Sequence, residues 1–352
     1  MTKVLDDLIA LLEIEPLEVN LFRGVSPDER VQRVFGGQVA AQALVAAGRT
    51  VDPDRHVHSL HAYFLRPGDP KVPIIFNVDR IRDGHSFTTR RVVAIQHGRA
   101  IFNLSASFQV LESGPEHQYE MPDVPPPEEL PTFLERVAPF KERFTPDVWE
   151  WLERERPIES RSCEAPRWID PEPRPAEQHV WIRANGTLPD DPLLHACVVA
   201  YASDLTLLDT AVMPHQINYT DANFQVASLD HAMWFHRPLR ADDWLLYHQK
   251  SPSAAGARGL AEGFIYARDG RLCVTVIQEG LMRPLAPAAA PASVWDVPGL
   301  ARWHGTDTWL DDDLACRTVA DRIALYNRQY PGQKPYLGFE NSEDLVRLVW
   351  DS

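Results

Sequence analysis

The sequence predicts an α+β protein built from two copies of one helix-plus-sheet unit. The motif His61-Ala-Tyr-Phe-Leu-Arg-Pro67 returns as His231-Ala-Met-Trp-Phe-His-Arg-Pro238. A mostly apolar stretch with helical character precedes each motif, over residues 35–48 and 193–208. A spacing of roughly 170 residues is too long for a solenoid repeat, so the pattern indicates a duplicated domain fused in one chain.

Each element of the first copy follows from a local pattern. Residues 3–13 place apolar side chains at helical spacing, which predicts a short amphipathic helix, and residues 20–24 predict a strand and turn. Residues 34–44 combine glycines, which permit close backbone approach, with alanines, which make a slim helix that a sheet can wrap. Strands are expected where β-branched and aromatic residues alternate between Asp-Gly and His-Gly turn signals, over residues 57–65, 73–80, 86–96 and 100–110.

The remaining chain is interpreted as a connection, a second copy and an extension. We interpret residues 1–112 as the first copy. Residues 113–178 are a Pro- and Glu-rich connection with a helical patch near residues 130–155. Residues 179–284 form the second copy, and residues 285–352 begin with a stiff Pro- and Ala-rich linker and continue as an extension of unknown fold. Strands of the second copy are expected over residues 179–184, 224–235, 243–250, 258–267 and 271–282.

The composition excludes several classes of function. A formal net charge of −15 argues against nucleic acid or an anionic membrane surface as the main partner. The four cysteines are scattered without a CxxC pair, which fits a reducing compartment and predicts neither a zinc site nor a disulfide framework. Because the sequence shows no signal peptide and no apolar run of about 18 residues, we expect a cytoplasmic protein that does not insert into membranes.

Asp204 is the first candidate functional residue. Cys197, Tyr201, Asp204 and Leu208 follow one another at helical spacing, so the carboxylate lies in an apolar stripe that should face the sheet. Burying an unpaired carboxylate is costly unless partners are supplied or the group is protonated. Asp204 could instead cap a break in the helix or pair with a core arginine, and these structural interpretations stay open. The corresponding helix, residues 35–48, contains no carboxylate.

Two strands of the second copy show a similar pattern. In residues 271–278, Gln278 ends a row of apolar side chains that share one face, and Ser228 ends such a row in residues 224–228. Taken singly, a buried Ser or Gln is more often a satisfied core residue than a catalyst. Together with Asp204 they could form one network of carboxylate, hydroxyl and amide around a water molecule.

The sequence resembles the acyl-CoA thioesterase II family over roughly residues 1–284. The resemblance implies a double hotdog fold, in which two long helices are each wrapped by an antiparallel sheet and the two sheets join. It also implies hydrolysis of acyl-CoA to free acid and CoA without a metal or organic cofactor, with Asp204, Ser228 and Gln278 as the catalytic trio. The matching segments are Val34-Phe-Gly-Gly-Gln-Val, residues 58–68, Trp181-Ile-Arg-Ala-Asn-Gly186, Tyr201-Ala-Ser-Asp-Leu205, residues 230–238 and Gln278-Glu-Gly-Leu-Met-Arg283.

The mechanism that the resemblance implies has Asp204 as general base, while Ser228 and Gln278 position a water molecule. A backbone N–H near the helix, or the Gln278 amide, would stabilise the developing oxyanion. Direct attack by Asp204 through an anhydride remains an alternative. Because residues 35–48 offer no acid, we expect catalysis to belong to the second copy and the first copy to be structural. By analogy, we expect the chain to form a homo-oligomer.

Other assignments remain open at this stage. The CoA phosphates call for basic groups, and the candidates, which could equally form strand-end salt bridges, are Arg66, Arg90, Arg91, Arg237 and Arg258. An enoyl-CoA hydratase of the hotdog type would need an Asp and a His acting together, but His195 lies over two helical turns before Asp204. A non-catalytic acyl-CoA-binding protein is the third possibility, and the complete trio argues against it.

Overall fold

The computed structural model describes residues 2–27, 33–165, 173–215 and 224–285. The chain divides into two units, Met1–Pro284 and Leu285–Ser352, so the predicted extension lies outside the described residues apart from Leu285. None of the described helices is long and apolar enough to cross a membrane. The helices are α1 (Lys3–Leu12), α2 (Gly36–Gly48), α3 (Phe133–Val137), α4 (Pro146–Glu153), α5 (Pro192–Ser203) and α6 (Asp209–Val212).

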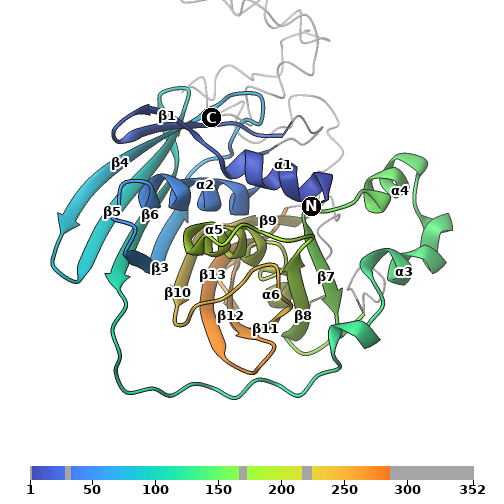
Figure 1. Cartoon of the computed structure of the whole chain (residues 1–352). Helices are drawn as coiled ribbons and strands as arrows, with labels where there is room; N and C mark the ends of the chain where they lie inside the picture. The colour runs from blue at the N-terminus through green and yellow to red at the C-terminus, as the bar shows by residue number, and fades with distance from the viewer. Residues whose placement is uncertain (1, 28–32, 166–172, 216–223, 286–352) are drawn as a thin grey trace, which may run out of the picture. The chain divides into compact units, whose positions relative to one another are not determined.

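One antiparallel sheet of 13 strands runs through the first unit in the order β1-β2-β4-β5-β6-β3-β10-β13-β12-β11-β8-β7, with β9 paired to β13 (Figure 1). The strands of the first half are β1 (Glu15–Glu18), β2 (Leu21–Gly24), β3 (Arg55–Phe64), β4 (Ile74–Asp83), β5 (Phe87–Gln96) and β6 (Arg99–Val110). Those of the second half are β7 (Ile158–Ser162), β8 (Glu177–Ala184), β9 (Phe224–Ser228), β10 (Asp230–Phe235), β11 (Leu245–Ala255), β12 (Arg258–Ala267) and β13 (Leu272–Pro284). The two halves therefore repeat one order of strands.

The halves join where β3 pairs with β10, and the repeated motifs themselves form this junction. His61 lies opposite Ala232, with Leu60 opposite Met233 and Ala62 opposite His231. This register is that of a two-fold axis passing between His61 and Ala232, as in a symmetric dimer. Residues that lie opposite each other on paired strands point to the same face of the sheet, so His231 shares its face with Ala62 and Leu60 and not with His61. Leu60 is therefore the structural counterpart of His231. The motifs differ in length by one residue, and the structure aligns them from their Arg-Pro ends.

The segment 113–178, interpreted as a connection, also adds a strand to the sheet. β7 pairs with β8 at the edge of the second half, in the place that β1 has in the first half. The same segment contains α3 and α4, which enclose a small apolar cluster of Val137, Trp149 and Leu152. Between β6 and these helices the chain runs as a long extended stretch along the second half (Figure 1).

The two central helices, α2 and α5, lie side by side against the sheet, with α1 next to α2 (Figure 1). They run antiparallel, because Gly37 at the start of α2 meets Tyr201 near the end of α5, and Gly48 at the end of α2 meets Leu193 near the start of α5. A Cβ at Gly37 would lie 2.5 Å from the Tyr201 carbonyl oxygen. The small residues of α2 thus allow the close helix packing that its sequence predicted.

Two predicted boundaries were wrong. The helix expected over residues 193–208 ends at Ser203, because the Ser203 carbonyl accepts a hydrogen bond from the Tyr247 hydroxyl at 3.1 Å and the Ser203 hydroxyl donates back to Ala200. These hydrogen bonds fix the last turn of α5. The strand expected over residues 224–235 is two strands, β9 and β10, separated at Leu229.

Candidate active site

Asp204 lies immediately after α5 and not within a helical stripe. It is the C-cap residue, with φ −87° and ψ −2°, so its backbone still continues the helical turn. The interpretation that Asp204 caps a break in the helix therefore describes its backbone position correctly. It does not explain the direction of the side chain, which turns toward the sheet and toward the start of α2.

The structure brings the three predicted residues together. Gln278 Nε2 on β13 donates to Asp204 Oδ1 at 2.7 Å, and Ser228 Oγ on β9 lies 3.4 Å from the same oxygen. A third hydrogen bond comes from the backbone N–H of Gly37 in α2. The amide bond is short and strong, whereas the hydroxyl contact is long for an O–H···O bond.

Burial governs the protonation of Asp204. Removal of the carboxylate from water raises its pKa to about 6, while the hydrogen bonds from Gln278, Gly37 and Ser228 act in the opposite direction. The residue as a whole is only partly buried. A carboxylate of this pKa is mostly ionised at neutral pH and basic enough to accept a proton from water, which is what a general base needs.

Gln278 has one more feature that matters for a bound water. The residue is fully buried, and its Oε1 has no hydrogen-bond partner in the described part of the chain. Because Nε2 donates to Asp204, Oε1 is left as an acceptor beside the carboxylate. A buried acceptor without a partner is costly, and a water molecule held between Asp204 and Gln278 would satisfy it.

The first copy contributes directly to this site, which the sequence did not indicate. Besides the Gly37 N–H, the start of α2 brings Gly36 so near that a Cβ there would lie 2.7 Å from Asp204 Oδ2. Backbone N–H groups at a helix N-terminus carry partial positive charge and attract anions. The α2 N-terminus therefore faces the carboxylate of the second copy.

The opposite ends of α2 and α5 form the counterpart of this site. The C-cap of α2 is Arg49 where that of α5 is Asp204. The registers of β3 with β6 and β9 with β13 place Val57 where Ser228 stands and Ala106 where Gln278 stands. None of the three counterparts retains the acid, the hydroxyl or the amide, so the trio exists only at one end.

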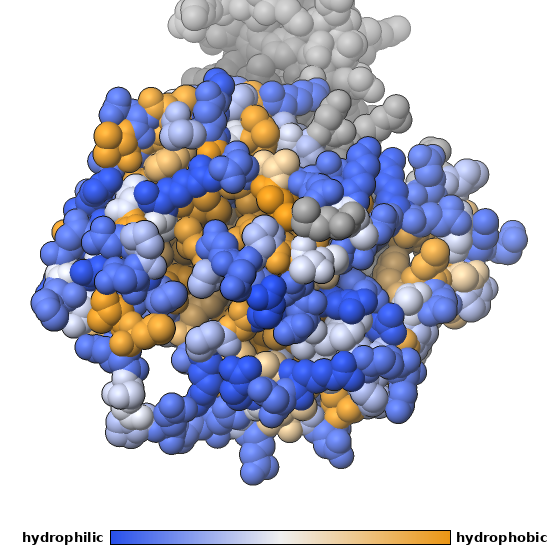
Figure 2. Space-filling model, in the orientation of Figure 1, coloured by the Kyte–Doolittle hydropathy of each residue, from blue (hydrophilic) through white to orange (hydrophobic). Residues whose placement is uncertain are grey.

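A cavity of 1620 Å³ lies at this counterpart end, lined among others by Arg49, Val57 and Leu193. Asp204, Ser228 and Gln278 do not line it. Figure 2 shows one face of the molecule as largely hydrophilic, with hydrophobic side chains gathered in a hollow near its centre. The cavity therefore lies apart from the candidate trio, which is at the other end of the helices.

A neighbouring Ser–His pair was missed by the sequence analysis. Ser203 Oγ lies 2.8 Å from His231 Nε2, and both residues are buried. Burial lowers the pKa of His231 to about 4, so the ring is neutral. His231 Nδ1 has no partner among the residues that the structure describes, so no carboxylate orients it as in a serine hydrolase triad. The pair instead supports the end of α5 that carries Asp204.

The arginine candidates are all engaged in the protein. Arg90 is 1% exposed and bonds to Thr50 and Asp83, which excludes it from the mouth of a pocket. Arg91 pairs with Asp79 at 2.9 Å, Arg237 with Glu116 at 3.2 Å and Arg258 with Glu279 at 2.8 Å, while Arg66 donates to the Ala100 carbonyl. The salt-bridge alternative noted for these residues is therefore present for Arg90, Arg91, Arg237 and Arg258.

His195 does not join Asp204. It lies near the start of α5, where its Nδ1 accepts a hydrogen bond from the Ala241 N–H at 3.0 Å, and Asp204 follows the last residue of the same helix. Nine residues of helix separate the two by about 13 Å. The paired Asp and His of an enoyl-CoA hydratase are thus not brought together here.

Two helices wrapped by one continuous antiparallel sheet, with an Asp, Ser and Gln at a helix end, define a double hotdog protein. The family model described as acyl-CoA thioesterase matches residues 153–281, and the one described as acyl-CoA thioesterase N-terminal domain matches residues 26–109. This chain belongs to the acyl-CoA thioesterase family. The predicted fold class is confirmed.

Relatives and solved structures agree with this assignment. The chain is 46% identical over 285 residues to acyl-coenzyme A thioesterase 8 of Rattus norvegicus, covering 78% of this chain and 88% of that protein. It is 42% identical over 291 residues to acyl-CoA thioesterase 2 of Haemophilus influenzae, covering 80% and 99%. The crystal structure of an acyl-CoA thioesterase II from Mycobacterium marinum matches with 47% identity and a TM-score of 0.65, covering 80% of this chain and 98% of that one.

Proposed function

We propose that this protein hydrolyses acyl-CoA thioesters to a free acid and CoA, with Asp204 as general base. The observation that carries the proposal is the Asp204–Gln278 pair. The carboxylate has a raised pKa and accepts from Gln278 Nε2 at 2.7 Å, and the amide oxygen beside it is an unsatisfied acceptor. These two groups can hold the two hydrogens of one water molecule.

In the proposed reaction, Asp204 removes a proton from this water while the water oxygen bonds to the thioester carbon. The C–S bond of the tetrahedral intermediate then breaks, and the departing CoA sulfur takes the proton back from Asp204. We propose that the positive end of α2 stabilises the developing oxyanion, while the Gly37 N–H at that end donates to Asp204. Ser228, within 3.4 Å of the carboxylate, is proposed to orient the water.

The test is a steady-state assay of the full chain with acyl-CoA substrates, following free CoA. Asp204→Asn should lower kcat by roughly 10²–10⁴, the range for loss of a general base, and leave the circular dichroism spectrum unchanged. Hydrolysis at the wild-type rate by this variant would contradict the assignment. Release of CoA also separates a hydrolase from a hydratase or a binding protein, because neither of those cleaves the thioester.

The anhydride alternative has a distinct signature. Direct attack by Asp204 would leave an acyl group on its carboxylate, which mass spectrometry of acid-quenched enzyme can detect after a single turnover. An adduct on a peptide containing Asp204 would replace the water mechanism. Its absence during turnover would leave the general-base route.

We also infer a cytoplasmic homo-oligomer with no nucleic-acid partner. The net charge of −15 supports the exclusion of nucleic acid, and Cys163, Cys197 and Cys273 are free thiols, as expected in a reducing compartment. Light scattering on the eluate of a size-exclusion column tests the assembly, and a single species at the mass of one chain, 39.9 kDa, would contradict it.

A further inference from the structure

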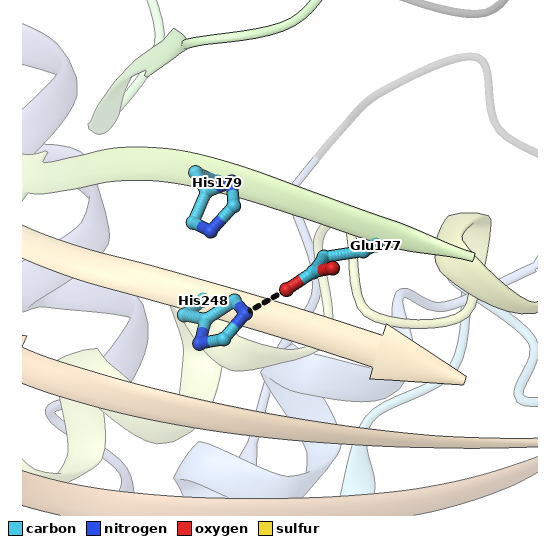
Figure 3. A group of neighbouring side chains, drawn as sticks. All are labelled: Glu177, His179 and His248. Atoms are coloured by element: carbon cyan, nitrogen blue, oxygen red, sulfur yellow. Dashed lines mark hydrogen bonds and ion pairs between the residues drawn. The ribbon is translucent and has the colours of Figure 1, made fainter. Parts of the chain in front are cut away.

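A group of ionisable side chains lies on the second half of the sheet, away from the Asp204 site. On the paired strands β8 and β11, His179 lies directly opposite His248 and Glu177 directly opposite Lys250. All four share one side of the sheet by strand alternation. Figure 3 shows His179 and Glu177 extending from β8 toward His248 on β11.

These side chains are held in a defined arrangement. The imidazole rings of His179 and His248 stack with centroids 4.5 Å apart and an interplanar angle of 11°. His248 Nε2 lies 2.7 Å from Glu177 Oε1, and His179 Nδ1 lies 2.8 Å from Glu164 Oε1. The two histidine side chains are only 15% and 9% exposed.

The pattern of carboxylates is that of a metal site and its supporting groups. A histidine that binds a metal usually donates its other ring N–H to a carboxylate, which fixes the tautomer and the ring orientation. Glu164 has this role toward His179 Nδ1 and leaves Nε2 as a lone-pair donor. His179, His248 and Glu177 each offer one ligand atom, and the three atoms lie within 4.8 Å of one another.

We propose that His179, His248 and Glu177 form a binding site for one Zn²⁺ ion, oriented by Glu164. Zn²⁺ takes the place of the hydrogen between His248 Nε2 and Glu177 Oε1, and the neutral His248 ring then carries its one hydrogen on Nδ1. Side-chain rotations on the fixed strands bring the ligand atoms to Zn–N and Zn–O distances of about 2.0–2.2 Å. Water completes the coordination, because three protein ligands leave a position open.

The ligand set favours zinc over a magnesium or calcium ion. Imidazole suits zinc and copper, whereas the harder cations prefer oxygen ligands throughout. Lys250 Nζ lies 3.4 Å from Glu177 Oε1 and opposes the ion, so its removal should strengthen binding.

The proposed zinc site lies on the side of β8 and β11 that faces away from the segment after Asp204. On the opposite side of the same strands, Gln178 and Gln249 hydrogen-bond to each other at 2.8 Å and hold Thr206 and Thr210. These threonines follow Asp204 in the chain. A metal ion that clamps β8 to β11 therefore stiffens the platform on which the segment after Asp204 rests.

The experiment is isothermal titration of the chelator-treated full chain with Zn²⁺, together with thermal melts. We expect one saturable ion per chain whose binding raises Tm, since a ligand that binds only the native state stabilises it. His248→Gln, which preserves a donor to Glu177, and His179→Ala should each abolish this binding. Glu164→Gln should weaken it about 10- to 100-fold, the usual cost of removing a supporting carboxylate, and Lys250→Ala should tighten it.

The matched control is His61→Ala, which removes a sheet histidine packed against Trp234 and should leave Zn²⁺ affinity unchanged. Melts of the metal-free variants establish that each is folded. Equal Zn²⁺ affinity in the wild type and in His248→Gln, or no saturable binding by the wild type, would overturn the proposal. Loss of hydrolysis in Asp204→Asn has no bearing on this outcome, so the zinc site and the proposed activity are tested separately.

Discussion

Gly36 and Asp204 belong to different copies of the repeat, yet a Cβ on Gly36 would lie 2.7 Å from Asp204 Oδ2. The same Cβ would lie 2.8 Å from the ring of Phe64, so it could not move away from the carboxylate without a further clash. The space beside the candidate base is therefore set by the absence of a side chain at the start of α2. Only the antiparallel packing of α2 against α5 creates this relationship.

The first prediction is that Gly36→Ala lowers kcat about 10- to 100-fold, because a displacement of a reacting group by about 1 Å can cost that much. KM should change less, since the substitution displaces the base and removes no binding group. The control is Gly114→Ala, where a Cβ would meet open space. An unchanged kcat in Gly36→Ala would mean that the carboxylate tolerates the displacement and is not held for catalysis.

The sequence predicted the members of the site but not the reason they meet. Asp204, Ser228 and Gln278 were identified from polar side chains in apolar rows. On β13 the row holds for Val274, Val276 and Gln278, but the register shifts before Val274, and Leu272 belongs to a separate apolar cluster. The row on the helix was wrong, because α5 ends at Ser203. The bond from Tyr247 to the Ser203 carbonyl, which connects residues 44 positions apart, leaves no periodic signal in the sequence.

The contribution of α2 to the Asp204 site could not be predicted from the sequence either. Gly36 and Gly37 were explained by close packing, which is correct, but a local pattern cannot say which atoms approach them. Their neighbours, Asp204 and Tyr201, are set by the two-fold relation of the copies. That relation follows from the register of β3 with β10. The repeated motif suggested His61 as the counterpart of His231, which is one residue away from the true counterpart, Leu60.

The second prediction concerns Ser228. Ser228→Thr should keep most of the activity because the hydroxyl remains, whereas Ser228→Ala should lower kcat about tenfold through loss of one hydrogen bond to the water or to Asp204. Steady-state kinetics of the two variants check this directly. An acyl group found on Ser228 by mass spectrometry would instead make it a covalent nucleophile and rule out the orienting role.

The third prediction is a pH profile. Since Asp204 must be ionised to accept a proton and its pKa is raised to about 6, kcat/KM should fall tenfold per pH unit below about 6 and level off above it. Gln278→Ala removes the hydrogen bond that most lowers this pKa, so the midpoint should move upward. The product acid should be quantified by chromatography, because thiol reagents respond to pH themselves. A midpoint near 4 in the wild type would contradict the burial of the base.

The last prediction is that Asp204→Asn is less active than the wild type but has a larger free energy of unfolding at neutral and alkaline pH. The carboxyl has a pKa of 3.8 when unperturbed and about 6 in the native protein, so between these values the native state binds more protons than the unfolded state. The free energy of unfolding of the wild type must then decrease as the pH rises from about 4 to 6, and the loss persists above 6.

An asparagine cannot ionise, and its oxygen can still accept from Gln278, so the variant avoids this loss. Because the residue is only partly buried, we expect the free energy of unfolding of Asp204→Asn to exceed that of the wild type by about 1–2 kcal/mol at pH 8 and by nearly nothing at pH 4. Urea unfolding at the two pH values measures both differences. A wild type that is the more stable protein at pH 8 would show that the native site favours the charged carboxylate, and the raised pKa assigned to the base would then be wrong.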